Sequence, residues 1–103
     1  MPFTHNAALL DACVLSALSR GDTYGYELTV RIKSFHEVSE STLYPVLKRL
    51  QKENLLSTYD EAVNGRNRRY YRITDEGFSQ LETYKTEWER FKEIIDNALY
   101  LEV

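Results

Sequence analysis

The sequence predicts a mainly helical fold that carries one small β-hairpin. Three observations predict it: apolar residues recur at helical spacing before residue 51, two strand-like segments flank Asn64-Gly65, and the segment after residue 74 repeats apolar residues at heptad spacing. The 103 residues suit one small domain, whose single core is only marginally sufficient. We therefore expect help from a partner subunit.

The first two helices are expected before residue 34. Residues 5–19 are apolar around most of a helical circumference, so this helix must be covered on several sides. Gly21 suits the left-handed position that follows a helix. Asp22 or Thr23 is then expected to cap a second helix that ends near Lys33.

A third helix is expected to begin at a serine cap, either Ser39 or Ser41. Pro45 lies close enough to the start to remove at most one backbone hydrogen bond. The buried stripe, at spacings of three and four, is expected to be Leu43, Val46 or Leu47, and Leu50.

Two strands are expected over residues 55–59 and 68–73. Asn64-Gly65 between them can supply the positive φ angles of a tight turn. Alternation places Tyr71 and Ile73 on one face, with Tyr70 and Arg72 on the other.

A long last helix is expected after Thr74, whose hydroxyl can cap it. Its apolar seam steps by three and four residues, which is the heptad spacing of a helix that packs against a partner helix. A homodimer is therefore expected, with an interface formed by Leu81, Tyr84, Trp88, Phe91 and Ile95.

The charge is unevenly distributed. The net charge is −3, yet residues 31–72 carry nine basic and five acidic side chains, whereas residues 73–103 carry three basic and eight acidic ones. Three arginines near the hairpin turn, Arg66, Arg68 and Arg69, repel one another, and phosphate is their natural counter-charge. Basic charge therefore gathers on the third helix and the hairpin, as expected for nucleic-acid binding.

Three helices followed by a basic hairpin are typical of a winged helix-turn-helix, in which the third helix enters the DNA major groove and the hairpin, or wing, contacts phosphates. Hydroxyls at a helix start can contact phosphates or base edges, and Lys or Arg can read guanine. Alternatively, the serines only cap the helix, and Lys48 and Arg49 only form a solvated surface. In this alternative Tyr24 is a packing residue that contacts no phosphate. The residues expected to contact double-stranded DNA are Tyr24, Ser39, Ser41, Thr42, Tyr44, Lys48, Arg49, Arg66, Arg68 and Arg69.

Other classes of function lack sequence support. His5 and His36 lie in unrelated segments, and no metal, nucleotide or nucleophile motif occurs, so we expect no enzyme, no metal and no required cofactor. Cys13 is the only cysteine and is expected to be a small core residue. No apolar run reaches the roughly 18 residues that span a bilayer, and no signal peptide is recognisable, so a cytoplasmic location is expected.

Five short segments are distributed through these elements: Tyr24-Gly25-Tyr26-Glu27-Leu28, Ser41 to Leu50, Gly65-Arg66, Arg69 to Thr74, and Gly77. In order and spacing they resemble the PadR family of transcriptional regulators, over nearly the whole chain. A last helix that ends near residue 103 is similar to that of the short-tailed subgroup, which includes multidrug-binding regulators. The resemblance implies a winged helix-turn-helix domain over residues 1–73 and a C-terminal dimerisation helix over 74–103.

The resemblance also implies how the protein works. The last helix would pack across the partner's first helix, and the dimer would repress a nearby promoter at a palindromic operator until a small molecule binds. In drug-binding members a tryptophan eleven residues after the glycine stacks on planar ligands, and Trp88 lies at that offset from Gly77. Alternatively, Trp88 only fills the seam. The residues expected around an aromatic effector are His5, Ala8, Ala12, Trp88 and Lys92.

Lys92 stands where those members place an acid, so planar neutral or anionic molecules are expected to bind in preference to cationic ones. The function predicted from these observations is that of a homodimeric DNA-binding transcriptional repressor. The alternative is a winged-helix adaptor whose basic wing binds an acidic protein surface. Salt dependence and the number of protomers per site distinguish the two.

Overall fold

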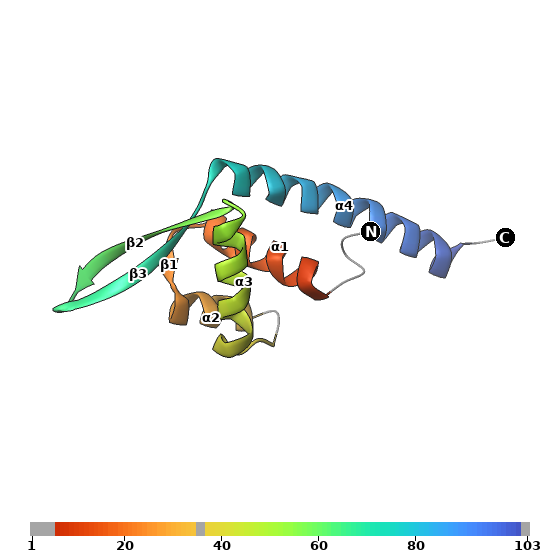
Figure 1. The fold of residues 1–103 in the computed structure, drawn as a ribbon. Helices are drawn as coiled ribbons and strands as arrows, with labels where there is room; N and C mark the ends of the chain where they lie inside the picture. Colours follow the sequence, from red (N-terminus) through yellow and green to blue (C-terminus); the bar gives the residue numbers. More distant parts are fainter. Residues whose placement is uncertain (1–5, 35–36, 102–103) are drawn as a thin grey trace.

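The computed structural model describes residues 6–34 and 37–101. The elements are α1 (Asn6–Ser19), β1 (Thr23–Tyr24), α2 (Gly25–Lys33), α3 (Glu40–Lys52), β2 (Leu56–Val63), β3 (Arg66–Ile73) and α4 (Asp75–Tyr100), as Figure 1 shows. This order confirms a mainly helical fold with a small β-sheet and a long last helix.

The core lies where α1, α2 and α3 pack together beside the base of the sheet. Leucine and isoleucine side chains from each element are fully buried there, and together they remove a large apolar area from water. The expected stripe of α3 is confirmed: Val46 is half-buried, and the fully buried members are Leu43, Leu47 and Leu50.

The caps of the helices were predicted in part. Ser39 caps α3, because its Oγ accepts a hydrogen bond from the Thr42 amide at 3.3 Å. The expected cap of α2 by Asp22 or Thr23 is wrong. Tyr24 precedes that helix without a side-chain cap, because Thr23 and Tyr24 form a short strand instead.

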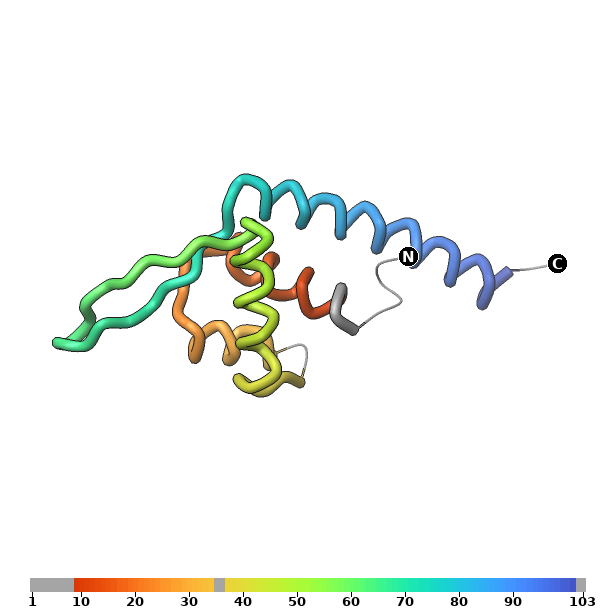
Figure 2. Tube along the Cα trace, in the orientation of Figure 1, coloured from red at the N-terminus to blue at the C-terminus, as the bar shows by residue number. Residues whose placement is uncertain are grey.

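The sheet has three antiparallel strands in the order β1-β3-β2. Tyr24 pairs with Tyr70, and the hairpin pairs from Leu56 opposite Ile73 to Val63 opposite Arg66. The turn is confirmed, since Asn64 and Gly65 have φ angles of 53° and 77°. Both hairpin strands are longer than expected, because pairing continues to the turn and the wing projects as a narrow ribbon (Figure 2).

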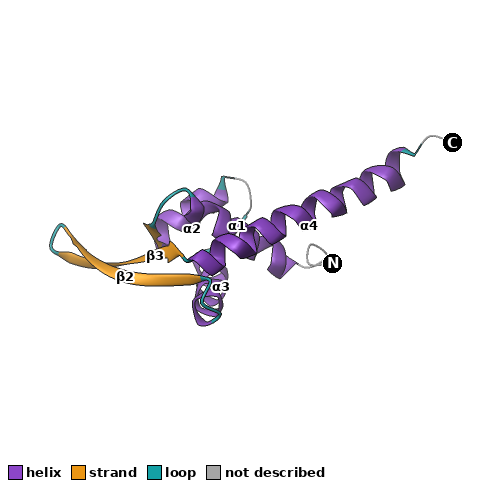
Figure 3. Cartoon of the chain, turned by 90° about the horizontal axis from the view of Figure 1, so that it is seen from above, coloured by secondary structure: helices purple, strands orange, loops and turns teal. Residues whose placement is uncertain are grey.

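The last helix begins as expected after Thr74, whose Oγ1 accepts a hydrogen bond from the Gly77 amide at 3.0 Å. Leu81 in its first half is buried with the core and Tyr84 is packed against it, while the second half extends beyond the other elements (Figures 1 and 3). None of the helices in the described part of the chain is long and apolar enough to cross a membrane.

Candidate nucleic-acid interface

The outward face of α3 begins with a cluster of hydroxyl groups. The Oγ of Ser39 lies 2.9 Å from the Oγ of Ser41 and 3.1 Å from the Oγ1 of Thr42. Tyr44 and Lys48 follow on this helix and are exposed. The prediction that Ser39 caps the helix is thus confirmed. The hydroxyl, phenol and ammonium groups that follow it on α3 are exposed and can contact another molecule.

A surface hollow of about 560 Å³ connects α3 with α2 and the wing. Gly25, the first residue of α2, allows close packing here, because a Cβ atom at this position would lie 2.9 Å from the Tyr44 hydroxyl. Two arginines of β3 close the other side. The residues that line this hollow, which we call the α2–wing hollow, are Tyr24, Gly25, Tyr26, Tyr44, Arg68, Arg69 and Tyr71.

Aromatic and cationic side chains alternate across one face of the sheet. The Arg68 guanidinium lies 4.4 Å from the centre of the Tyr24 ring, and Tyr24 meets Tyr70 edge-on at 5.7 Å. Tyr70 stacks on Tyr59 at 5.4 Å, and the Arg72 guanidinium lies 4.8 Å from the Tyr59 ring. These contacts fix the side chain of Arg68 at the hollow, so less conformational entropy is lost when it binds an anion.

Asp22 holds the base of the wing against the loop that precedes β1. Its Oδ2 accepts hydrogen bonds from the Tyr59 hydroxyl at 2.8 Å and from Arg72 Nε at 3.0 Å. The hydrogen bond to Asp22 raises the pKa of Tyr59, so its phenol remains a donor at neutral pH. Asp22 therefore orients the wing, whereas the sequence predicted only that it could cap the second helix.

The wing arginines leave positive charge available for an anion. Arg69 Nε lies 3.7 Å from Asp60 Oδ1, and both side chains are more than half exposed, so this ion pair is weak and exchangeable. Within the described residues, Arg66 and Arg68 have no acidic partner. The wing can thus offer three guanidinium groups to a phosphate backbone.

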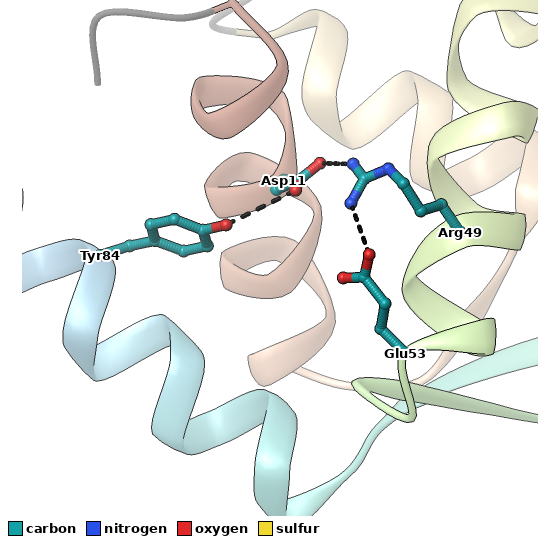
Figure 4. A network of polar contacts seen from close by, with 4 residues as sticks. All are labelled: Asp11, Arg49, Glu53 and Tyr84. Carbon is teal, nitrogen blue, oxygen red and sulfur yellow. Dashed lines mark hydrogen bonds and ion pairs between the residues drawn. The ribbon is translucent and has the colours of Figure 1, made fainter. Parts of the chain in front are cut away.

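Arg49 lies in a different environment from the other residues expected to contact DNA. Its Nη2 pairs with Oδ1 of Asp11, and its Nη1 lies 3.4 Å from Oε2 of Glu53 (Figure 4). The hydrogen bond to Asp11 is the largest contribution to a raised pKa for Arg49. The sequence did not indicate that Asp11 pairs with Arg49, because no local pattern links a residue of α1 to a residue of α3.

A second hollow, of about 280 Å³, separates α1 from α4, and we call it the α1–α4 cavity. It brings Ala12 and Trp88 together, as expected for an effector site, whereas Lys92 is absent from its lining. His5 and the side chain of Ala8 lie outside the described residues. The lining residues are Leu9, Ala12, Cys13, Ser16, Leu81, Tyr84, Lys85 and Trp88.

Cys13 is half-buried in this cavity rather than in the centre of the core. Burial raises the pKa of its thiol, which keeps the thiol protonated and unreactive at neutral pH. Among residues 9–34 and 37–101, no three His, Cys, Asp or Glu side chains are grouped to hold a metal ion.

The chain is similar to a known protein family and to solved structures of its members. The model of the transcriptional regulator PadR-like family matches residues 14–83. A PadR-like transcriptional regulator from Bacillus cereus is 39% identical, with a TM-score of 0.82 over 91% of this chain and 94% of that one. A PadR family regulator from Clostridium difficile is 34% identical, with a TM-score of 0.82 over 87% and 97%.

Bacillus subtilis PadR, solved in complex with operator DNA, is 26% identical, with a TM-score of 0.68 over 74% of this chain and 46% of that one. The matched family consists of transcriptional regulators and not of enzymes. With its matching sequence and its winged-helix architecture, this chain belongs to the PadR-like family of transcriptional regulators.

Proposed function

We propose that this chain acts in the cytoplasm as a homodimeric repressor that binds double-stranded DNA at a palindromic promoter operator. The observation that carries the proposal is the α2–wing hollow, where the exposed face of α3, the start of α2 and the wing arginines converge. The operator complex of Bacillus subtilis PadR, which has a similar fold, supports it.

In this proposal α3 lies in the major groove and presents Ser41, Thr42, Tyr44 and Lys48 to the bases and the nearest phosphates. Arg66, Arg68 and Arg69 hold the backbone beside it. Ser39 stays a cap, and Tyr24 supports Arg68 from beneath. The wing therefore supplies affinity, whereas α3 supplies sequence preference.

Replacing Arg68 and Arg69 with alanine is expected to weaken binding to all DNA sequences alike. Each lost phosphate contact lowers the magnitude of the slope of log K against log salt by about 0.9, and the double variant removes two arginines from each of the two wings of the dimer, so the slope should fall by about 4 in magnitude. Fluorescence anisotropy over a salt series measures this. Arg90→Ala is the matched control, since it removes an exposed positive charge from α4. If the slope stays unchanged in the double variant, the wing does not contact the DNA.

The homodimer is proposed to form through the apolar seam of α4 and through α1, with residues 74–103 as the dimerisation segment and residues 1–73 as the DNA-binding one. Large apolar side chains are exposed along the projecting half of α4, a pattern that marks protein interaction surfaces. In the described part of the chain these are Trp88, Ile94, Ile95, Leu99 and Tyr100, and Leu101 directly after the helix is exposed as well. A two-fold dimer would place two α3 helices about 34 Å apart, on successive turns of the major groove.

The α1–α4 cavity is proposed to receive a planar aromatic effector that releases the DNA. Trp88 and Tyr84 supply aromatic faces, and Lys85 in the lining and Lys92 one turn beyond Trp88 supply positive charge. A neutral or anionic molecule should therefore bind better than a cationic one.

Titration of tryptophan fluorescence with matched anionic and cationic planar compounds tests this effector site, because Trp88 is the only tryptophan. The expected result is stronger quenching by the anionic compound. Quenching by the cationic compound alone would mean that the site prefers cations, contrary to the proposal. If neither compound quenches the fluorescence, Trp88 only packs in the apolar seam.

A further inference from the structure

We propose that Arg49 positions α3 through Asp11 instead of contacting DNA, and that Tyr84 connects this ion pair to the α1–α4 cavity. The inference rests on the proposed DNA binding and adds a route by which the cavity can influence it. Four side chains form the route, three of them from α1, α3 and α4 and one from the residue that follows α3. We call them the Asp11 network: Asp11, Arg49, Glu53 and Tyr84 (Figure 4).

The centre of the network is the buried carboxylate of Asp11. Its side chain is only 7% exposed, so it needs partners for both oxygens. Oδ1 is paired with Arg49 of α3, and Oδ2 accepts a hydrogen bond from the Tyr84 hydroxyl of α4 at 3.5 Å. One side chain of α1 therefore holds two helices, each by a separate oxygen.

The two sides of this carboxylate differ in strength. The Arg49 side is a charge-assisted ion pair, which is among the stronger polar contacts in proteins. The Tyr84 hydrogen bond, at 3.5 Å, is at the upper limit for such a bond and is weak. The hydrogen bond to α4 can therefore be displaced at low cost while the ion pair with Arg49 persists.

Arg49 is poorly placed to contact DNA as well. Its guanidinium bridges Asp11 and Glu53, and its side chain is 41% exposed. Turning it towards a phosphate would leave the buried Asp11 carboxylate without its cation, a penalty that Lys48 does not incur. Lys48, the preceding residue, is exposed and has no acidic partner among the described residues.

Tyr84 has two roles that meet at one ring. Its side chain lines the α1–α4 cavity, and its hydroxyl reaches Asp11. Burial is the largest cause of its raised pKa, so the hydroxyl stays protonated and can donate. A molecule in the cavity that moves the ring removes a donor from Asp11 and changes how Asp11 holds Arg49 and α3.

The test is a double-mutant cycle on binding to a genomic DNA fragment that the wild-type protein retains. Asp11→Asn and Arg49→Met should each weaken binding by about 2- to 30-fold, and the double variant should be no weaker than the weaker single variant. The salt slope should not change in any of them. Arg49→Lys should resemble Arg49→Met, because an ammonium cannot bridge Asp11 and Glu53 as a guanidinium does.

The opposite model makes different predictions. If Arg49 contacts phosphate, Asp11→Asn frees it and binding stays equal or tightens. In that case Arg49→Lys binds nearly as the wild type does, and Arg49→Met, which is present in both protomers of the dimer, lowers the magnitude of the slope by about 1.8. Any of these results overturns the positioning role. Thermal unfolding curves of the variants identify a temperature at which all of them are folded, and binding is measured there. Lys52→Met, on the same helix, is the control for the loss of an exposed positive charge.

Tyr84→Phe tests the connection to the cavity, because it removes the hydroxyl and keeps the ring. It should change DNA affinity by about two-fold or more in the wild-type background and have no effect in an Asp11→Leu background, because leucine offers no acceptor to the Tyr84 hydroxyl. If Tyr84→Phe has the same effect in both backgrounds, or no effect in either, the α1–α4 cavity is not coupled to the Asp11 network. If wild-type protein retains no DNA, the proposed function itself fails, whereas failure of this inference leaves wild-type binding intact.

Discussion

Replacing Gly77 with alanine is expected to lower the free energy of unfolding by about 1–3 kcal/mol, the cost of overpacking a well-filled site. A Cβ atom here would lie 2.3 Å from the backbone oxygen of Leu55 and 2.6 Å from Cγ1 of Ile73. That oxygen also accepts the Thr74 amide at 3.1 Å, so it cannot move without loss of a hydrogen bond. Urea unfolding at a fixed protein concentration measures the change.

The sign of this result is informative, because Gly77 lies in a helix. In an open helical position, alanine is more stable than glycine by about 1 kcal/mol. A gain in stability for Gly77→Ala would therefore mean that the backbone at Leu55 shifts to accommodate the added Cβ atom. Ser79→Ala is the control, since Ser79 is exposed two residues further along α4 and its replacement should change stability by less than about 0.5 kcal/mol.

Introducing a charge at Ile95 is expected to abolish the dimer. Ile95 lies on the projecting half of α4, is 37% exposed in the single chain and belongs to the apolar seam. Aspartate there would place an unpaired carboxylate between two helices, which costs several kcal/mol if it remains buried. Sedimentation velocity should show one species with the mass of a single chain.

The matched control is Asn97→Asp, which adds the same charge one half-turn away. Asn97 is exposed and lies outside the seam, so this variant should sediment as the wild type does. If Ile95→Asp remains dimeric, the interface lies elsewhere on the chain. If both variants dissociate, general charge repulsion on the acidic α4 is the cause, and the seam is not specific.

Local signals explain what the sequence predicted of the fold. The Ser39 and Thr74 caps, the Asn64-Gly65 turn and the α3 stripe each depend on residues within a few positions, and all four are confirmed. The first strand was missed because its two residues form a strand only by pairing with Tyr70 and Tyr71, far along the chain. That pairing also explains why the α2 cap was predicted wrongly.

The candidate site was predictable only where exposure follows from a helical pattern. Tyr44 and Lys48 are exposed because they lie off the buried stripe of α3. Periodicity carries no information about long-range polar contacts, so neither the pairing of Arg49 with Asp11 nor the contacts of Asp22 to the wing could be predicted. The role of a charged residue therefore depended on a partner that only the fold reveals.

The central claim is that a dimer of this chain binds DNA through its wings and α3 helices. The most direct measurement is the affinity of the wild-type protein for a retained genomic DNA fragment over a series of salt concentrations. Two wings that each contribute Arg68 and Arg69 predict a slope of log K against log salt with a magnitude of at least about 4, since each phosphate contributes about 0.9. A slope near zero, or retention of an acidic protein and no DNA, would contradict the account.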